Sequence, residues 1–228
     1  MESSLHRQLK ELYGVTAADR EVQVEGFRID AVAGGRLIEI QRASLSGIRS
    51  KLATLLESHH VTLVKPLAVR TRISRRSAAG GEIVSRRYSP IRRSVYHLFE
   101  ELVHLGSIFP HPRLHLEVVL MEQEEVRIPR KKRRYHGADF QVEDRLLLNV
   151  ISRQTFTTAR DLAGLLPTSL PAQFHTQDLA RESAIPRWLA QRMVYCLRQA
   201  GVLRSVGKMG NAILYAAACE PKRMRKAA

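Results

Sequence analysis

The chain has 228 residues and a formal net charge of +15, from 37 lysines and arginines against 22 acids. At roughly 100–200 residues per domain, this length suits one large domain or two small ones. A content of 44% hydrophobic and 26% charged residues can build a core, which excludes wholesale disorder. No apolar run is long enough for a membrane-spanning helix, and the N-terminus lacks a secretory signal, so we expect a cytoplasmic protein without membrane contact.

The positive charge is concentrated in three segments. Residues 70–93, 127–134 and 221–228 contain 18 of the basic residues and one acid, whereas the other 188 residues contain 19 basic and 21 acidic ones. A near-neutral body with clustered cations indicates a polyanionic partner. Charge that serves only solubility is the alternative left open.

The first half of the chain alternates helical and extended patterns. Apolar spacing predicts, in chain order, a helix over 2–13, an extended region over 22–41, a helix over 45–57, a strand over 61–69, a helix over 95–105 and a strand over 114–128. Pro66 favours an edge strand or a strand end for 61–69. Between these elements, residues 70–93 form an arginine-rich excursion around Gly80-Gly81. We expect residues 1–128 to form one domain.

The second half of the chain has a different residue pattern. Residues 129–140, rich in proline, basic residues and glycine, are typical of a linker. Helical patterns follow at 144–151, 159–166, 177–182 and 186–200, and two short strands are predicted within 201–215. We expect a second, mainly α-helical domain over residues 141–218 and a basic tail over 219–228.

The dipeptide Gly34-Gly35 predicts a two-residue hairpin loop. Residues whose numbers sum to 69 then lie opposite one another, which places Asp30 opposite Glu39. Like charges in direct opposition destabilise a ladder unless something positive lies between them. Arg28 is a structural candidate, and a divalent cation is the alternative, because hard cations bind carboxylate oxygens.

Two further residues extend this acidic pair. Gln41 is expected on the same side as Glu39 and can add an amide group. On the helix over 2–13, Glu2 falls beside the apolar stripe whereas Glu11 falls nearly opposite, so Glu2 would face the protein and Glu11 the solvent. A frayed terminal position is the alternative for Glu2.

The order of these elements resembles the core of the PD-(D/E)XK nuclease superfamily. It consists of a helix with an acid, strands with Asp30 and Glu39-Ile40-Gln41, a helix over 45–57 and a strand over 61–69. The resemblance covers roughly residues 1–70 and implies a restriction-endonuclease-like α/β (α+β) core, a mixed sheet flanked by helices. It implies metal-dependent hydrolysis of DNA with Mg²⁺ or Mn²⁺ as cofactor, Asp30 and Glu39 as metal ligands and Glu2 as a further ligand.

One departure from the family pattern concerns its lysine, which Gln41 replaces. Gln41 can orient a water molecule but supplies no positive charge. Lys51, on the following helix, is the candidate for a displaced ammonium group. The residue before Asp30 is Ile29, where proline is common in the family.

Residues 176–203 resemble a winged helix-turn-helix, within a module of about residues 141–218. Gln177–Glu182 would be the first helix with Thr176 as its N-cap, and Pro186–Ala200 the recognition helix, followed by a wing. An inward stripe is expected at Leu189, Met193, Cys196 and Leu197, and we also expect Trp188 in the core.

The DNA-binding residues expected from these assignments are basic or polar side chains in the excursion, linker, recognition helix and wing: Arg42, Arg75, Arg76, Arg86, Arg87, Lys131, Lys132, Arg133, Arg134, Arg187, Gln191, Arg192 and Lys208. The sequence thus predicts a DNA endonuclease with a DNA-binding module, and a homodimer is compatible with it. A catalytically inactive DNA-binding or regulatory protein, and a protein-interaction scaffold, are the alternatives.

Overall fold

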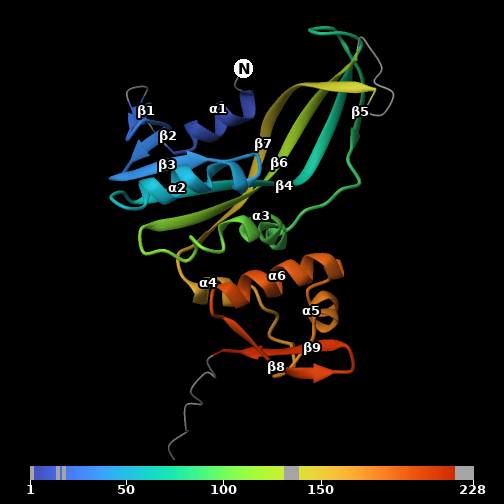
Figure 1. Ribbon diagram of the computed structural model, residues 1–228. Helices are drawn as coiled ribbons and strands as arrows, with labels where there is room; N and C mark the ends of the chain where they lie inside the picture. Colours follow the sequence, from blue (N-terminus) through green and yellow to red (C-terminus); the bar gives the residue numbers. More distant parts are fainter. Residues whose placement is uncertain (1–2, 14–15, 17–18, 131–138, 219–228) are drawn as a thin grey trace, which may run out of the picture. The chain divides into compact units, whose positions relative to one another are not determined.

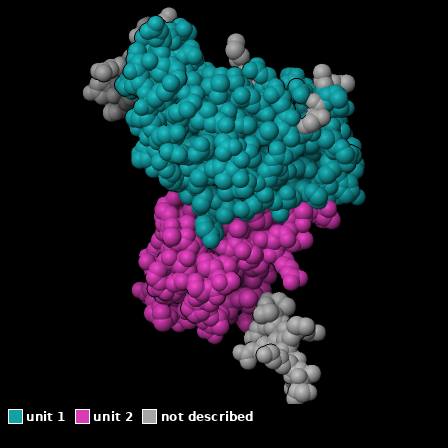
Figure 2. Space-filling model, turned by 180° about the vertical axis from the view of Figure 1, so that it is seen from behind, with its two compact units in different colours: residues 1–98, 113–155 teal, residues 99–112, 156–228 magenta. Residues whose placement is uncertain are grey.

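The computed structural model describes residues 3–13, 16, 19–130 and 139–218. The chain divides into two compact units, shown in different colours in Figure 2. Unit 1 comprises Met1–Leu98 and Arg113–Thr155, and unit 2 comprises Phe99–Pro112 and Phe156–Ala228. No helix in the described ranges combines the length and apolar character needed to cross a membrane.

Unit 1 begins with a helix and an antiparallel meander. Its first elements are α1 (Ser4–Glu11), β1 (Arg20–Val24), β2 (Phe27–Ala33) and β3 (Arg36–Ile40). Gly34 and Gly35 have φ angles of 56° and 71°, a conformation that glycine adopts without steric cost. The observed pairs Ala31–Ile38, Val32–Leu37 and Ala33–Arg36 confirm the predicted register.

A large mixed sheet organises the rest of unit 1. After η2 (Leu45–Ile48) and α2 (Arg49–Leu55) come β4 (Val61–Arg76), β5 (Ile83–Tyr88), η3 (Val95–Leu98), β6 (Leu114–Pro129) and β7 (Phe140–Phe156). The strand order is β1-β2-β3-β4-β6-β7, and β5 pairs with the far part of β4 (Figure 1). β4 is parallel to both β3 and β6. The expected α/β mixed sheet with flanking helices is therefore present.

Helices cover both faces of this sheet beside β3. Leu5 and Leu9 of α1 are fully buried against Ile38 and Ile40. Glu39, which alternates with these two residues along β3, contacts Lys51 of α2. Since neighbouring strand residues point to opposite faces, α1 and α2 lie on opposite faces of the sheet. Glu11 is exposed, as predicted.

The expectation that Pro66 marks an edge or a strand end is wrong for β4 as a whole and correct only locally, because no strand pairs with one side of β4 at Pro66. β4 continues to Arg76 as an interior strand. The Val64 carbonyl accepts from Gln41 N–H on the β3 side, so by alternation the Pro66 nitrogen faces the same side. β3 has ended at Ile40 there, and β5 pairs only from Arg72 onward. The missing N–H of proline therefore costs no ladder bond.

The predicted helix over residues 144–151 is also wrong, because this segment lies within β7. Toward both ends of β7 the even-numbered residues are less exposed than their neighbours, the two-residue period of a strand. The apolar cluster at 146–148 obscured this period. The second unit consequently begins at Phe156 rather than at residue 141, and it includes residues 99–112 from the expected first domain.

Unit 2 is mainly helical. Its elements are α3 (Phe99–Leu102), η4 (Val103–Leu105), α4 (Ala159–Ala163), α5 (Thr176–Glu182), α6 (Arg187–Gln199), β8 (Leu203–Met209) and β9 (Ala212–Ala217). α3 packs against α6, and β8 and β9 form an antiparallel hairpin (Figure 1). The predicted buried stripe of α6 is confirmed, since Leu189, Met193, Cys196 and Leu197 are all buried.

Two local predictions in unit 2 need correction. The N-cap of α5 is His175, not Thr176: His175 Nδ1 accepts from Asp178 N–H at 3.2 Å, and Asp178 Oδ2 accepts from His175 N–H at 3.0 Å. Trp188 is 46% exposed rather than in the core, because it lies in the first turn of α6 outside the buried stripe.

Candidate functional site

Asp30 and Glu39 follow the last regular pair of the β2–β3 ladder. Beyond the Ala31–Ile38 pair, a side-chain oxygen replaces a backbone carbonyl as hydrogen-bond acceptor: Ile40 N–H donates to Asp30 Oδ2 at 2.8 Å. A backbone hydrogen bond from Asp30 in turn helps to stabilise the Glu39 carboxylate. Each acid therefore accepts a backbone hydrogen bond from the neighbouring strand. The predicted direct pairing of Asp30 with Glu39 is not among the observed pairs of these two strands, which end at Ala31–Ile38.

Asp30 is held by two side chains of α1. Asp30 Oδ1 lies 2.9 Å from His6 Nε2 and 3.4 Å from Lys10 Nζ, and the Lys10 side chain also pairs with Glu21 at 3.2 Å. Burial opposes ionisation of Asp30, but the hydrogen bonds from His6 and Ile40 N–H, with the charges of His6 and Lys10, hold its pKa below the ordinary value.

Glu39 is held by a cation of α2. Lys51 Nζ donates to Glu39 Oε2 at 2.7 Å and to the Arg28 carbonyl at 2.6 Å. Burial raises the pKa of Glu39, and the charge of Asp30 adds to this effect, while the hydrogen bond from Lys51 opposes it. The pKa values of the two acids are thus displaced in opposite directions, an arrangement that is common where carboxyl groups do chemical work.

The structure distributes the other predicted site residues differently. Gln41 Nε2 donates to the Ser44 carbonyl at 3.2 Å, so its amide serves the turn after β3. The Arg28 side chain pairs with Glu21. Glu2 lies outside the described residues. Lys51, the candidate for a displaced ammonium group, is the one that reaches Glu39.

His6 and Lys10 were missed by sequence reasoning. They are spaced i, i+4 on α1 and follow Leu5 and Leu9 by one position each, so a helical wheel places them along one edge of the buried stripe. That spacing was a usable signal. Lys10 is only 5% exposed, and a buried lysine requires an acidic partner.

The donor set at Asp30 and Glu39 suits a hard divalent cation. Mg²⁺ is typically held by one or two carboxylates, with water and phosphate oxygens completing its coordination. Across the described ranges there is no group of three or more histidine, cysteine or acidic residues arranged for a metal. Two carboxylates without cysteine or histidine would fit Mg²⁺ or Mn²⁺ better than zinc.

The arginine-rich excursion forms a hairpin of β5 with the extension of β4. Arg86 and Arg87 are exposed on β5. Arg75 lies 3.5 Å from Asp139 and Arg76 lies 3.2 Å from Glu143, so both of these arginines have acidic neighbours. Among the other predicted DNA-binding residues, Lys131, Lys132, Arg133 and Arg134 lie outside the described residues, as does the basic tail over 219–228.

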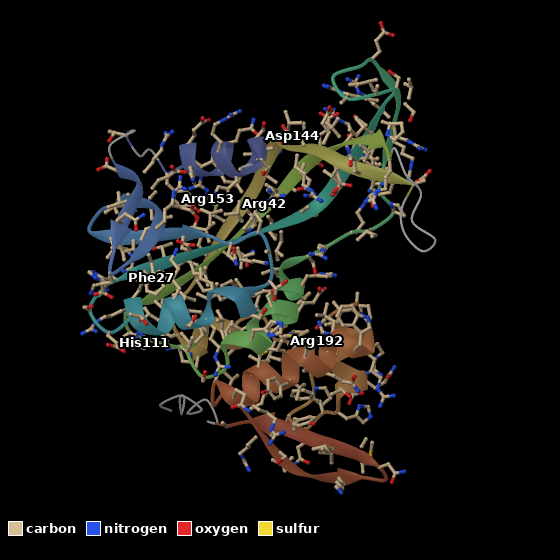
Figure 3. All side chains as sticks on the ribbon, turned by 45° about the horizontal axis from the view of Figure 1, so that its top comes forward. Phe27, Arg42, His111, Asp144, Arg153 and Arg192 are labelled. Carbon is tan, nitrogen blue, oxygen red and sulfur yellow. The ribbon has the colours of Figure 1, made fainter. Side chains whose placement is uncertain are left out.

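The predicted DNA-binding residues of unit 2 lie on its surface. Arg187, Gln191 and Arg192 are exposed on α6, and Lys208 is exposed on β8. Figure 3 labels Arg192 on α6. Its guanidinium lies 5.3 Å from the centre of the Trp188 ring, and Tyr195, one turn further on, is 49% exposed. α6 therefore presents both cationic and aromatic groups to solvent.

Comparison with known proteins identifies the family but assigns no activity. Residues 3–157 match the family model described as "Domain of unknown function (DUF8091)", and the chain belongs to this family. An uncharacterized protein of Treponema pallidum (strain Nichols) is 31% identical over 181 residues, which cover 79% of this chain and 72% of that protein. No solved structure matches the chain. The family match ends next to the last residue of β7.

Proposed function

We propose that the protein is a metal-dependent DNA endonuclease, with its catalytic site at Asp30 and Glu39 and a DNA-binding module in unit 2. The observation that carries this proposal is the pair of adjacent carboxylates with opposed pKa shifts, one of which contacts the ammonium group of Lys51. Action on DNA fits the cytoplasmic location expected from the sequence.

The chemistry divides between the acids and the lysine. Asp30 and Glu39 would hold Mg²⁺ or Mn²⁺, which polarises a phosphate and lowers the pKa of a bound water. Lys51 would stabilise negative charge that develops on the phosphate, since its Nζ already lies 2.7 Å from Glu39. His6 and Lys10 would keep the Asp30 carboxylate ionised and in place.

The order of elements supports the resemblance to PD-(D/E)XK nucleases. The sequence α1-β1-β2-β3-α2-β4, with β3 parallel to β4, is the core order expected of that superfamily. In unit 2, α4, α5 and α6 precede the β8–β9 hairpin, and Phe174 forms a bridge with Tyr215 of β9. Three helices with such a small sheet support a winged helix.

Cleavage of supercoiled plasmid DNA tests the proposal. The full chain is incubated with Mg²⁺, with Mn²⁺ or with EDTA, beside the near-isosteric variants Asp30→Asn and Glu39→Gln. Glu25→Gln is the matched control, because Glu25 is an acid of unit 1 that pairs with His59 away from the site. We expect cleavage that EDTA abolishes and that either site variant lowers by about a hundredfold or more.

Two outcomes of this experiment would contradict the proposal. If both site variants fold, as judged by thermal melting and circular dichroism, and each lowers cleavage less than about tenfold, the catalytic assignment is wrong. DNA binding without cleavage under every metal condition would instead favour a non-catalytic DNA-binding protein. A gel-filtration or sedimentation experiment with DNA would test the homodimer with which the sequence is compatible.

A second candidate function is protein binding by unit 2. Trp188, Arg192 and Tyr195 are spaced i, i+4, i+7 and exposed on α6. Tryptophan, tyrosine and arginine are also the residue types enriched at protein interfaces. A salt titration separates the two candidates, because phosphate contacts give a steep loss of DNA affinity with salt and a protein-binding surface does not.

A further inference from the structure

A second site in unit 1 lies beyond the carboxylates, in a cavity of about 610 Å³. We call it the arginine cavity, because Arg42, Arg93, Arg127 and Arg145 line it together with one acid, Glu125. Four guanidinium groups against one carboxylate leave its walls positively charged. A volume of this size suits a small-molecule ligand.

Glu125 fixes two of these arginines rather than neutralising the cavity. It is only 8% exposed; its Oε1 accepts from Arg127 Nε at 2.7 Å, and its Oε2 accepts from Arg145 Nε at 3.0 Å. The Arg127 guanidinium also stacks over the Phe140 ring at 3.8 Å. Each guanidinium has five N–H donors, so this acid leaves several donors to a ligand. Both arginines are held in place before any ligand arrives, which lowers the entropic cost of binding.

Arg42 completes the cationic wall from the end of β3 (Figure 3). It donates to Ser3 Oγ and is partly buried. Burial lowers the pKa of Arg42, and the nearby charge of Arg145 lowers it further, while the charges of Asp144 and Glu125 oppose this effect. Lys65, only 2% exposed, donates to the carbonyl of Ala43 at 2.7 Å and so supports the backbone of this wall. An anion between the arginines would relieve their mutual repulsion.

The remaining lining divides into hydroxyl and apolar groups. Ser89 Oγ accepts from Ile91 N–H, and Thr71 Oγ1 accepts from Gln123 Nε2, so both hydroxyl hydrogens can be donated to a ligand. Pro66 and Met121 provide apolar surface in the same cavity. A ligand with one strongly anionic end and one flat or apolar end matches this combination.

We propose that the arginine cavity binds a nucleotide through its phosphate group, either as a free mononucleotide or as the phosphorylated end of a DNA strand. Guanidinium groups bind phosphate oxygens in bidentate fashion, which favours phosphate over a simple halide. The apolar lining would receive the sugar or base. Binding at this site does not depend on metal or on hydrolysis, so it can be measured separately from the nuclease proposal.

Binding assays on the full chain in EDTA, at fixed ionic strength, test this assignment. The probes are thymidine 5′-monophosphate against thymidine, and a short single-stranded oligonucleotide with a 5′-phosphate against the same strand with a 5′-hydroxyl. We expect the phosphate to raise affinity by about tenfold in at least one of the two pairs. If the phosphate raises affinity only for the oligonucleotide, the ligand is the phosphorylated strand end. If it raises affinity equally for the mononucleotide, the ligand is a free nucleotide.

The variant Arg93→Gln locates the effect, since Arg93 is exposed and lines the cavity. It should remove most of the advantage of the phosphorylated probe. Arg87→Gln is the matched control: it removes the same charge from unit 1 outside the cavity, and should weaken both oligonucleotides equally. Arg42→Gln provides a second test from another segment of the lining. Equal affinity for phosphorylated and unphosphorylated probes, or an advantage that survives both cavity variants, would overturn the proposal.

Discussion

The two charged sites of unit 1 differ in the ratio of acidic to basic side chains. At the end of the β2–β3 ladder, the acids Asp30 and Glu39 are surrounded by His6, Lys10 and Lys51. In the arginine cavity, which Arg42 joins three residues after Glu39, four arginines surround one acid. In the first site the acids and the basic side chains are close to balance. The second has an excess of positive charge among its lining residues, which a bound anion would compensate.

This difference gives the net charge of +15 a more specific meaning. Surface arginines such as Arg86 and Arg87 attract any polyanion, because exposed charges act through solvent and are screened by salt. Two of the cavity arginines, Arg127 and Arg145, are instead fixed by Glu125, and Arg127 also stacks on Phe140. Fixed guanidinium groups would select an anion by its shape. Sequence clustering detected the first group and also Arg93 and Arg127 of the second. The arginines of the cavity come from β6, β7 and the segments after β3 and after β5.

The largest expected effect concerns Lys51. The variant Lys51→Met leaves Glu39 largely buried without its ammonium partner, since the side chains are 16% and 13% exposed. We expect the free energy of unfolding to fall by about 3 kcal/mol and cleavage to fall by about a hundredfold. Urea denaturation and plasmid cleavage measure the two effects.

A double variant separates stability from catalysis at this pair. Lys51→Met with Glu39→Gln removes both charges, so the unfolding free energy should recover toward that of the wild type while cleavage stays low. A Lys51→Met protein as stable as the wild type would show that the observed ion pair contributes little, and would weaken the comparison with the arginine cavity.

A smaller effect is expected for Glu125→Gln in the arginine cavity. Removing the one acid should lower the free energy of unfolding by about 2 kcal/mol in chloride, because four arginines then repel one another. Phosphate should stabilise this variant more than the wild type, since a bound anion replaces the lost charge. Thermal melts in chloride and phosphate at equal ionic strength measure the difference.

The neighbouring Glu124→Gln is the control for that experiment. Glu124 accepts from Arg72 at 3.0 Å, and neither residue lines the cavity. Its loss should not create a specific response to phosphate. If both variants respond to phosphate equally, the anion acts on the protein in general and the cavity is not a phosphate site.

A third prediction concerns the exposed arginines of β5. Replacing Arg86 and Arg87 together with glutamine removes two candidate phosphate contacts. The slope of log affinity for DNA against log salt should become less steep by roughly 2, with an affinity loss of about tenfold. Fluorescence anisotropy across a salt series measures both. Arg160→Gln, an exposed change on α4, should leave the slope unchanged; an unchanged slope in the β5 variant would exclude this hairpin from the DNA interface.

Local patterns in the sequence predicted much of the fold. The register around Gly34-Gly35 follows from a loop of two glycines, and the buried stripe of α6 follows from helical spacing. Both depend on residues close together in the chain. The β7 strand was missed because an apolar cluster interrupts its alternation, and such a run fits a helix or a strand equally well.

Long-range packing explains what the sequence could not provide. Lys10 reaches Asp30 because α1 packs beside β2, and no local pattern states which helix covers which strand. Arg42 was expected to be a DNA contact, yet it is partly buried in a wall of the arginine cavity. Residues 99–112 join unit 2 through contacts of α3 with α6, which lie far apart in sequence.

The smallest expected effect concerns Asp161, an acid held by N–H and hydroxyl groups with no cation beside it. Its Oδ2 accepts from Thr157 N–H at 2.7 Å and Thr158 N–H at 2.8 Å, in the capping box of α4. These backbone hydrogen bonds, with that of the Thr157 hydroxyl, lower the pKa of Asp161 to about 2. Because the folded-state pKa is depressed, the stabilisation is present above the ordinary value near 3.8 and is lost as the pH falls from there toward 2.

Asp161→Ala should therefore lower the free energy of unfolding by about 1 kcal/mol at pH 7, the typical effect of losing a helix cap. The difference from the wild type should shrink as the pH is lowered below 3.8. Asp139→Ala, an exposed acid outside any cap, is the control, and urea denaturation at a series of pH values is the measurement. A difference that is independent of pH would mean that Asp161 acts through packing. In that case hydrogen bonds from N–H groups alone would not hold an acid ionised in this chain, and the cations around Asp30 would be required for its low pKa.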